Sequence, residues 1–195
     1  MKVRKGVIGV IPARYGSARF PGKPLAKICG KPMIQHVYER AKDSKVLDKL
    51  IVATDSEEIF RVVKSFGGEV IKTGENIPTG TDRTAEVVRI YPYEVVLNIQ
   101  CDEPLLEGWM LDKLAEPLVR DKSIHSSTLV KRITELKELE DPNLVRVILD
   151  KNGFALYFSR AVVPFYNSSP NKEEWIKNHE YYRHIGLYGF QRDFL

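Results

Sequence analysis

Three uninterrupted apolar runs, each followed by polar residues, limit what this chain can fold into. The first is GVIGVI (residues 6–11), closed by Pro12, and the other two lie within KLIVATD (49–55) and EVVLNIQCDEP (94–104), segments in which apolar residues give way to polar ones. Continuous runs of β-branched and aliphatic residues are typical of strands that are buried on both faces, as in a parallel sheet. We therefore expect these runs to form strands of one central sheet.

Segments with helical periodicity lie between these runs. Apolar residues recur at helical spacing over residues 33–41 and 59–66, and Gly67-Gly68 ends the second pattern. A third helix is expected over residues 82–91. The alternation of strand, loop and helix predicts right-handed βαβ units, and therefore a doubly wound α/β fold whose central sheet is mostly parallel and flanked by helices.

The pattern changes after about residue 105. One more helix is expected near residues 108–119, and short strands are expected at 124–133, 146–150, 154–160 and 185–190. The segment NSSPNKEE, residues 167–174, is typical of an exposed loop. We expect this half to be a smaller mixed subregion that completes the sheet and forms one wall of the ligand-binding site.

Composition excludes several classes of protein. The 195 residues carry 30 Lys and Arg against 26 Asp and Glu, a mild net charge of +4 that suits an anionic ligand without implying a nucleic acid. The only cysteines, Cys29 and Cys101, have neither disulfide-framework nor zinc-finger spacing, so we expect two reduced thiols in a cytoplasmic protein. No apolar stretch is long enough for a signal sequence or a membrane span.

A basic, glycine-containing loop follows the first apolar run. Residues 12–25 contain Arg14, Arg19 and Lys23 together with Gly16 and Gly22. The loop after the first strand of an open α/β sheet is the usual phosphate site, and glycine lets backbone amides approach an anion closely. The loop is therefore interpreted as a polyphosphate cradle, and the alternative is a solvated basic turn. Its spacing matches neither a Walker A loop nor a dinucleotide fingerprint.

Two carboxylates follow the third apolar run. Asp102 and Glu103 are expected at the same sheet edge as the basic loop, where a bare carboxylate would repel a polyphosphate. A Mg²⁺ ion held by Asp102 and phosphate oxygens would remove this repulsion. The alternative is an acidic turn before Pro104.

A third motif, PTGTDRTAEVV, spans residues 78–88. Thr79, Thr81 and Asp82 are suitable helix caps, while Gly80 and Arg83 leave room for contacts to a base or a phosphate. The residues alone leave both interpretations open.

Together these motifs resemble one family. In chain order, IPARYGSARFPGKPL, IVATD, TGTDRTAEV, NIQCDEP, ALYFSR and RHIGLYGF are similar to the 3-deoxy-manno-octulosonate (Kdo) cytidylyltransferases, over essentially the whole chain. The resemblance implies a Rossmann-like nucleotidyltransferase fold, a cytoplasmic homodimer, and Mg²⁺-dependent transfer of CMP from CTP to Kdo, releasing pyrophosphate, for lipopolysaccharide synthesis. It also implies one domain over 1–195, with a CTP-binding half over 1–105 and a sugar-binding, dimer-forming part over 106–195.

The resemblance assigns roles to individual residues. Arg14, Lys23 and Asp102 would be catalytic, with Asp102 binding the metal. Around the sugar it places Gln100, Arg160, His184 and Tyr188, although His184 could be a structural histidine and Tyr188 a core residue. The nucleotide would be bound by Ala13, Arg14, Gly16, Ser17, Arg19, Lys23, Thr79, Gly80, Thr81, Arg83 and Asp102.

Two departures from the family pattern bear on these expectations. Cys101 stands where the family usually has glycine, and a thiol facing outward there would be open to oxidants. The sequence ends at Leu195, whereas relatives continue for tens of residues that carry a second metal-binding aspartate and dimer-forming helices. If this ending is a truncation, we expect the chain to bind CTP and turn over poorly.

Three other classes of function remain as alternatives. The first is a related nucleotidyltransferase acting on another acidic sugar, such as a sialate or an eight-carbon amino-sugar analogue. The second is a nucleotide-binding protein without catalysis. The third, a nucleic-acid-binding module, fits poorly because the cations gather in one loop.

Overall fold

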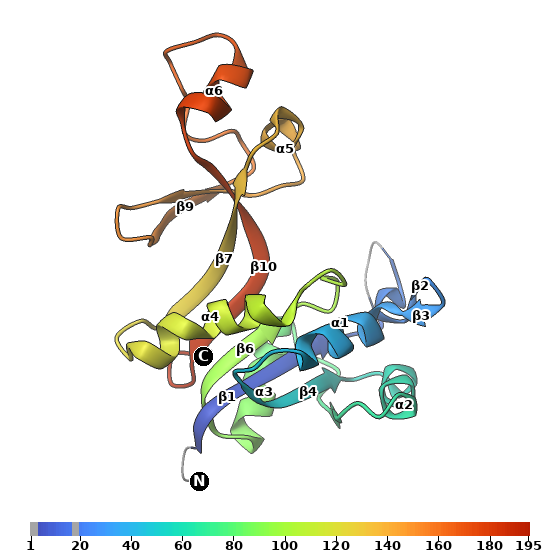
Figure 1. The fold of residues 1–195 in the computed structure, drawn as a ribbon. Helices are drawn as coiled ribbons and strands as arrows, with labels where there is room; N and C mark the ends of the chain where they lie inside the picture. The colour runs from blue at the N-terminus through green and yellow to red at the C-terminus, as the bar shows by residue number, and fades with distance from the viewer. Residues whose placement is uncertain (1–3, 17–19) are drawn as a thin grey trace. The chain divides into compact units, whose positions relative to one another are not determined.

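The computed structural model describes residues 4–16 and 20–195. Contacts between Cα atoms divide the chain into two compact units (Figure 1). Unit 1 comprises residues 1–127 and 186–195, and unit 2 comprises residues 128–185. Two strands, β7 (Ser126–Ile133) and β10 (Tyr181–Gln191), have residues in both units.

Unit 1 is built on a central sheet in the order β5, β4, β1, β6, β10. The first four strands are parallel, and residues 187–191 of β10 run antiparallel to β6. This arrangement confirms the predicted mostly parallel α/β sheet. The parallel strands are β1 (Arg4–Ala13), β4 (Leu47–Thr54), β5 (Val70–Lys72) and β6 (Tyr93–Ile99).

Helices flank this sheet because its strands are apolar on both faces. Ile8 and Val10 share a buried cluster with Val87 and Val88 of the helix α3 (Gly80–Ile90). Alternate residues of β1 face the other way, where α1 (Met33–Lys42) and α4 (Gly108–Arg120) pack against the sheet and against each other (Figure 1). The predicted doubly wound arrangement is therefore present.

Smaller elements complete unit 1. The helix α2 (Glu57–Ser65) begins at the cap Ser56, whose Oγ accepts a hydrogen bond from Ile59 N at 3.3 Å. A 3-10 helix, η1 (Lys23–Leu25), forms the end of the basic loop, and a short hairpin links it to α1. The hairpin strands are β2 (Lys27–Ile28) and β3 (Lys31–Pro32).

Unit 2 is a mixed structure in which β8 (Arg146–Leu149) pairs antiparallel with β10 and with β9 (Ala155–Ser159). Two short helices, α5 (Leu136–Glu140) and α6 (Lys172–Asn178), belong to it. Its core cluster consists of Ile133, Leu139, Trp175 and Tyr181. The short strands expected in the second half of the chain are confirmed.

The loop expected over residues 167–174 is wrong at its end, because α6 begins at Lys172. Asn171 caps this helix by accepting a hydrogen bond from Glu173 N at 3.0 Å. Trp175 is buried and anchors the helix in the unit 2 core. Burial of this one large side chain stabilises a helix that its polar sequence does not suggest.

Candidate active site

Polar residues follow each of the three long parallel strands of unit 1. Arg14 comes directly after β1, Asp55 directly after β4, and Gln100 and Asp102 come after β6. Carboxyl ends of parallel strands lie at one edge of a sheet, and ligands of open α/β proteins bind there. The structure thus brings these residues to the expected edge.

The basic loop turns sharply before η1. Gly22 has a φ of +69°, which favours glycine, and its N–H donates to the carbonyl of Tyr15 at 2.9 Å. A Cβ on Gly22 would lie 3.3 Å from the Tyr15 ring, whereas a Cβ on Gly16 would meet nothing within 4 Å. Ala13 is the buried last residue of β1. The predicted ligands Ser17 and Arg19 lie outside the described residues.

The loop and the β6 turn meet through one ion pair. Lys23 Nζ lies 2.6 Å from Asp102 Oδ2, and the two side chains are 35% and 44% exposed. An exposed pair of this kind contributes only about 0–1 kcal/mol to stability. Its importance is positional, because it places a cation and a carboxylate side by side at the sheet edge.

Asp102 suits a magnesium ion as one ligand among several. Its carboxylate is a hard oxygen donor at the open sheet edge, and Mg²⁺ is usually held by one or two carboxylates together with substrate phosphates and water. Within residues 4–16 and 20–195, no three His, Cys, Asp or Glu side chains form a metal-binding group. The fit of Asp102 to Mg²⁺ therefore rests on its carboxylate oxygens, and phosphate oxygens and water would have to complete the coordination.

Cys101 lies beside this pair and is half-buried. Burial and the neighbouring Asp102 raise the pKa of its thiol to about 11, while Lys23 and Arg14 partly offset that rise. The thiol is therefore protonated at neutral pH. Since the thiolate is the reactive form, the structure makes Cys101 a poor target for oxidants and alkylating agents.

A buried amide links the β6 end to the start of α3. Asn98 is fully buried; its Nδ2 donates to Thr81 Oγ1 at 3.2 Å, and its Oδ1 accepts from Gln100 Nε2 at 3.1 Å. Thr79 caps α3 by accepting from Asp82 N at 3.1 Å, as predicted. A Cβ on Gly80 would lie 3.1 Å from Pro12, so glycine allows the helix start to approach β1. The sequence analysis did not assign Asn98, although it belongs to the NIQCDEP motif.

Arg83 is occupied within the fold. Its side chain is almost fully buried, and Nη2 lies 2.7 Å from Asp55 Oδ2. Its Nη1 donates to Thr73 Oγ1 and, at 3.2 Å, to the carbonyl of Gly74. These contacts tie α3 to the ends of β4 and β5, and a direct contact between Arg83 and a nucleotide base stays a prediction.

Two of the predicted sugar-binding residues belong to unit 1. Tyr188 of β10 pairs with Asn98 of β6, and burial and the charge of Glu103 raise the pKa of its half-buried phenol. A Cβ on Gly186 would lie 3.3 Å from Glu103 Oε1 and 3.8 Å from Gln100 Cγ. Glu103 and Gln100 therefore approach the backbone of β10 closely at Gly186, and Tyr188 lies two residues further along the same strand.

The other two predicted sugar-binding residues, Arg160 and His184, belong to unit 2. The exposed Arg160 donates from Nη1 to the carbonyls of Pro142 and Asn143, at 3.3 and 3.1 Å. His184 Nε2 lies 2.8 Å from Thr128 Oγ1, and its ring meets Phe158 edge-to-face. Burial lowers the pKa of His184. These contacts are typical of a structural histidine, and its role at a sugar stays a prediction.

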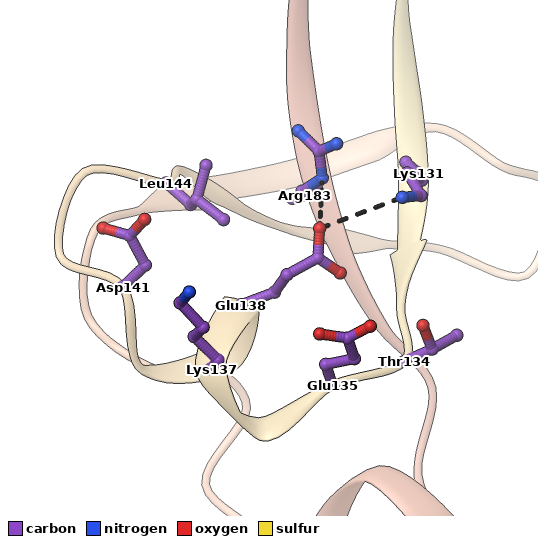
Figure 2. Close-up of a pocket in the computed structure, with 8 residues that line it drawn as sticks. All are labelled: Lys131, Thr134, Glu135, Lys137, Glu138, Asp141, Leu144 and Arg183. Atoms are coloured by element: carbon purple, nitrogen blue, oxygen red, sulfur yellow. Dashed lines mark ion pairs between the residues drawn. The ribbon is translucent and has the colours of Figure 1, made fainter.

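Unit 2 also contains a pocket of about 420 Å³ beside α5 (Figure 2). Glu138 forms ion pairs there with Arg183 at 3.2 Å and with Lys131 at 3.9 Å. Three cationic and three acidic side chains line the pocket, so its charge does not favour a ligand of either sign. The lining residues are Lys131, Thr134, Glu135, Lys137, Glu138, Asp141, Leu144 and Arg183.

A mostly parallel α/β sheet with a basic loop after β1 and a carboxylate after β6 defines a nucleotidyltransferase-like protein. The family model described as cytidylyltransferase matches residues 8–195. A 3-deoxy-manno-octulosonate cytidylyltransferase of Thermodesulfovibrio yellowstonii is 48% identical, over 94% of this chain and 74% of that protein. One from Fusobacterium nucleatum is 46% identical, over 96% and 74%.

Solved structures agree with the sequence relatives. A CMP:2-keto-3-deoxy-manno-octonic acid synthetase complexed with CTP superposes with a TM-score of 0.87 at 37% identity, over 97% of this chain and 75% of that one. A 4-diphosphocytidyl-2C-methyl-D-erythritol synthase from Anaerococcus prevotii, covering 97% and 71%, shares only the fold, with a TM-score of 0.56 at 13% identity. The chain belongs to the 3-deoxy-manno-octulosonate cytidylyltransferase family and is a nucleotidyltransferase.

Proposed function

We propose that the protein transfers CMP from CTP to the anomeric hydroxyl of Kdo and releases pyrophosphate. One observation carries the proposal beyond family membership: Lys23 and Asp102, 79 residues apart, meet at 2.6 Å at the sheet edge. This contact supports the proposal, because it brings the residue proposed to bind the triphosphate to the residue proposed to bind the metal, at the sheet edge where ligands of such folds bind.

The reaction is a nucleophilic displacement at the α-phosphorus of CTP. A bond forms between the sugar oxygen and phosphorus, the bond to the bridging α,β-oxygen breaks, and the electron pair leaves with pyrophosphate. Such a transfer depends chiefly on in-line positioning and on neutralising charge, so no protein nucleophile is required. The hydroxyl proton is released to solvent.

Arg14, Arg19 and Lys23 are the groups proposed to hold the triphosphate, with Lys23 stabilising the departing pyrophosphate. Arginine forks match phosphate oxygens in pairs, while the lysine ammonium acts as a point charge. Because Lys23 is paired with Asp102, it must shift or share its contact when the nucleotide binds. The start of α3, with Thr79, Gly80 and Thr81, is proposed to contact the base, and Asn98 fixes Thr81 there.

On the family resemblance we propose that Gln100, Tyr188, Arg160 and His184 each contact the sugar. Arg160 suits the sugar carboxylate because it is exposed and a planar guanidinium binds carboxylates in a bidentate manner. Asn98 orients Gln100 by accepting from its Nε2. The carboxylate of Glu103 lies near the phenol of Tyr188, and its oxygens could accept hydrogen bonds from the sugar hydroxyls.

Magnesium is proposed as the cofactor, with Asp102 as its protein ligand. When bound, the ion would neutralise phosphate charge and polarise the α-phosphorus. Without it, the Asp102 carboxylate would repel the triphosphate. The ammonium of Lys23 contributes a single positive charge next to the Asp102 carboxylate, which is less than the negative charge of a triphosphate.

Pyrophosphate release from the 195-residue chain tests the function. We expect release that requires both CTP and Kdo, that EDTA abolishes and that added Mg²⁺ restores. Comparing kcat/KM for Kdo with that for a sialate and an eight-carbon amino-sugar analogue tests the acceptor. CTP binding by calorimetry without sugar-dependent release would instead support a nucleotide-binding protein, and release without sugar would show hydrolysis.

We propose that two copies of the chain form a homodimer through β9. This strand lies at the end of the sheet order and exposes Leu156, Tyr157 and Phe158. Exposed apolar residues on an edge strand favour association with another chain. Sedimentation should give a species at twice the mass of the 22.3 kDa chain.

The dimer proposal also has a matched pair of variants. Leu156→Arg places a charge on the proposed interface, where the leucine is 66% exposed, and Leu105→Arg places one on a leucine of unit 1 that is 77% exposed. We expect Leu156→Arg alone to sediment as a monomer. A wild-type monomer, or two variants that behave alike, would contradict the assignment.

The part of the chain that the structure describes has no helix long and apolar enough to cross a membrane. A cytoplasmic location is proposed on other grounds. Cys29 and Cys101 are both free, and CTP is a cytoplasmic substrate. Cell fractionation with an antibody to the protein checks this location.

A further inference from the structure

Arg146, at the start of β8, is a buried cation with an unusual set of partners. Its side chain is only 1% exposed. The guanidinium donates to five main-chain carbonyl oxygens: those of Glu138, Leu139, Asp141, Leu144 and Arg160. A buried charge is tolerated only when it is paired or extensively hydrogen-bonded, so the fold depends on these carbonyls to keep Arg146 inside.

The five carbonyls belong to two segments that are distant in the sequence. Four come from α5 and the loop after it, residues 138–144, which Figure 2 shows around Glu138, Asp141 and Leu144. The fifth is the carbonyl of Arg160, which follows β9 and accepts from Arg146 Nη1 at 2.9 Å. Arg146 therefore fastens the residue after β9 to the α5 loop.

The same loop holds the other end of Arg160. Its Nη1 donates to the carbonyls of Pro142 and Asn143, which lie between the loop carbonyls that Arg146 binds. Arg146 thus fixes Arg160 twice, directly at its main chain and indirectly at its guanidinium. The β8–β9 register, with Arg146 opposite Ser159, keeps the two arginines at this spacing.

We propose that Arg146 is a positioning residue for sugar binding that acts through Arg160. The proposal rests on the proposed function, in which Arg160 binds the carboxylate of the acidic sugar. Lysine cannot replace Arg146 fully, because an ammonium has three donors on one nitrogen and lacks the planar fork that reaches two sets of carbonyls. The structure therefore assigns part of the sugar affinity to a side chain that does not touch the sugar.

Steady-state kinetics of Arg146→Met test this role. We expect KM for Kdo to rise by about 10- to 100-fold, since small misplacements of a binding group have effects of that size, while KM for CTP changes by less than about twofold. The control Arg132→Met removes an exposed arginine of unit 2, which pairs with Glu180, and should leave both KM values unchanged. Equal changes in the two KM values, or none, would overturn the proposal.

A double-mutant cycle separates positioning from general stability. Arg160→Met removes the proposed carboxylate-binding group. Adding Arg146→Met to it should then raise KM for Kdo little further, because both substitutions act on the same group, the guanidinium of Arg160. Additive effects would show that Arg146 does not act through Arg160. If Arg146→Met does not fold, Arg146→Lys replaces it in the cycle, with a smaller expected rise.

Hydrogen-exchange mass spectrometry distinguishes failure of this proposal from failure of the proposed function. In Arg146→Met, but not in Arg132→Met, amides of residues 138–144 and 159–161 should exchange faster. If the wild-type chain shows no sugar-dependent release, the proposed function fails, and faster exchange would still establish that Arg146 fixes Arg160. Unchanged exchange in both segments would exclude the positioning role.

Discussion

Asp102→Asn is expected to lower kcat for sugar-dependent pyrophosphate release by about 10³-fold, because a neutral amide binds Mg²⁺ weakly and leaves phosphate charge uncompensated. The fold should change little. Asp102 is 44% exposed, and its pair with Lys23 is of the exposed kind that contributes about 0–1 kcal/mol. Stopped assays over a range of Mg²⁺ concentrations, together with thermal unfolding, measure both effects.

Asp193→Asn is the matched control, because Asp193 is a 92% exposed aspartate of unit 1 that is distant in sequence from the β6 turn. It should retain full activity. Near-normal turnover by Asp102→Asn at ordinary Mg²⁺ would remove the metal assignment. A loss of thermal stability that accounts for the lost activity would show that Asp102 is structural instead.

The strands and helices around the site could be predicted because their signals are local. The apolar residues within 6–11, 49–54 and 94–99 are nearly continuous, and the structure places these ranges in β1, β4 and β6 of the parallel sheet. The helix after Thr79 was also predictable, and the structure shows that Thr79 is its cap, one of the two roles that the residues left open. By contrast, β5 has three residues and α5 has five, too few for a periodic pattern to emerge.

Site residues that come directly after a predicted strand could be found from the sequence, because ligands of open α/β sheets bind at the carboxyl ends of the strands. Arg14, Lys23, Gln100 and Asp102 each lie just after a strand or within the loop that follows one, and the structure brings Lys23 to Asp102. Sequence reasoning could not find partners that only the tertiary fold provides. The ion pair between Arg83 and Asp55 is such a case, whereas the contact between Arg83 and the nucleotide that the resemblance implies stays a prediction.

The same limit applies to Arg146. In the sequence RVILD, this residue reads as the polar end of a strand, and its neighbours give no sign of burial. Its five carbonyl partners come from segments 2 to 14 residues away along the chain. Such a set forms only when α5, β8 and β9 are packed together, so no local pattern encodes it.

Arg83→Met should lower the free energy of unfolding by about 3 kcal/mol or more, because removing one partner of a buried ion pair leaves the other charge buried and uncompensated. Asp55 is only 18% exposed and would lose its cation, while Thr73 and Gly74 would lose their donor. Urea unfolding followed by circular dichroism gives the value. Arg89→Met, at an exposed position in the last turn of the same helix, should be nearly neutral.

Combining Arg83→Met with Asp55→Asn shows which role Arg83 has. If the pair braces α3 against β4 and β5, the double variant should be more stable than Arg83→Met alone, because the stranded charge is gone. In that case KM for CTP should be raised in Arg83→Met and should be lower again in the double variant, in parallel with the gain in stability. If instead Arg83 contacts the cytosine base, KM for CTP would stay raised whatever residue 55 is, and stability would fall little. The buried contacts of Arg83 favour the first result, in which one ion pair supports the start of α3 that is proposed to contact the base.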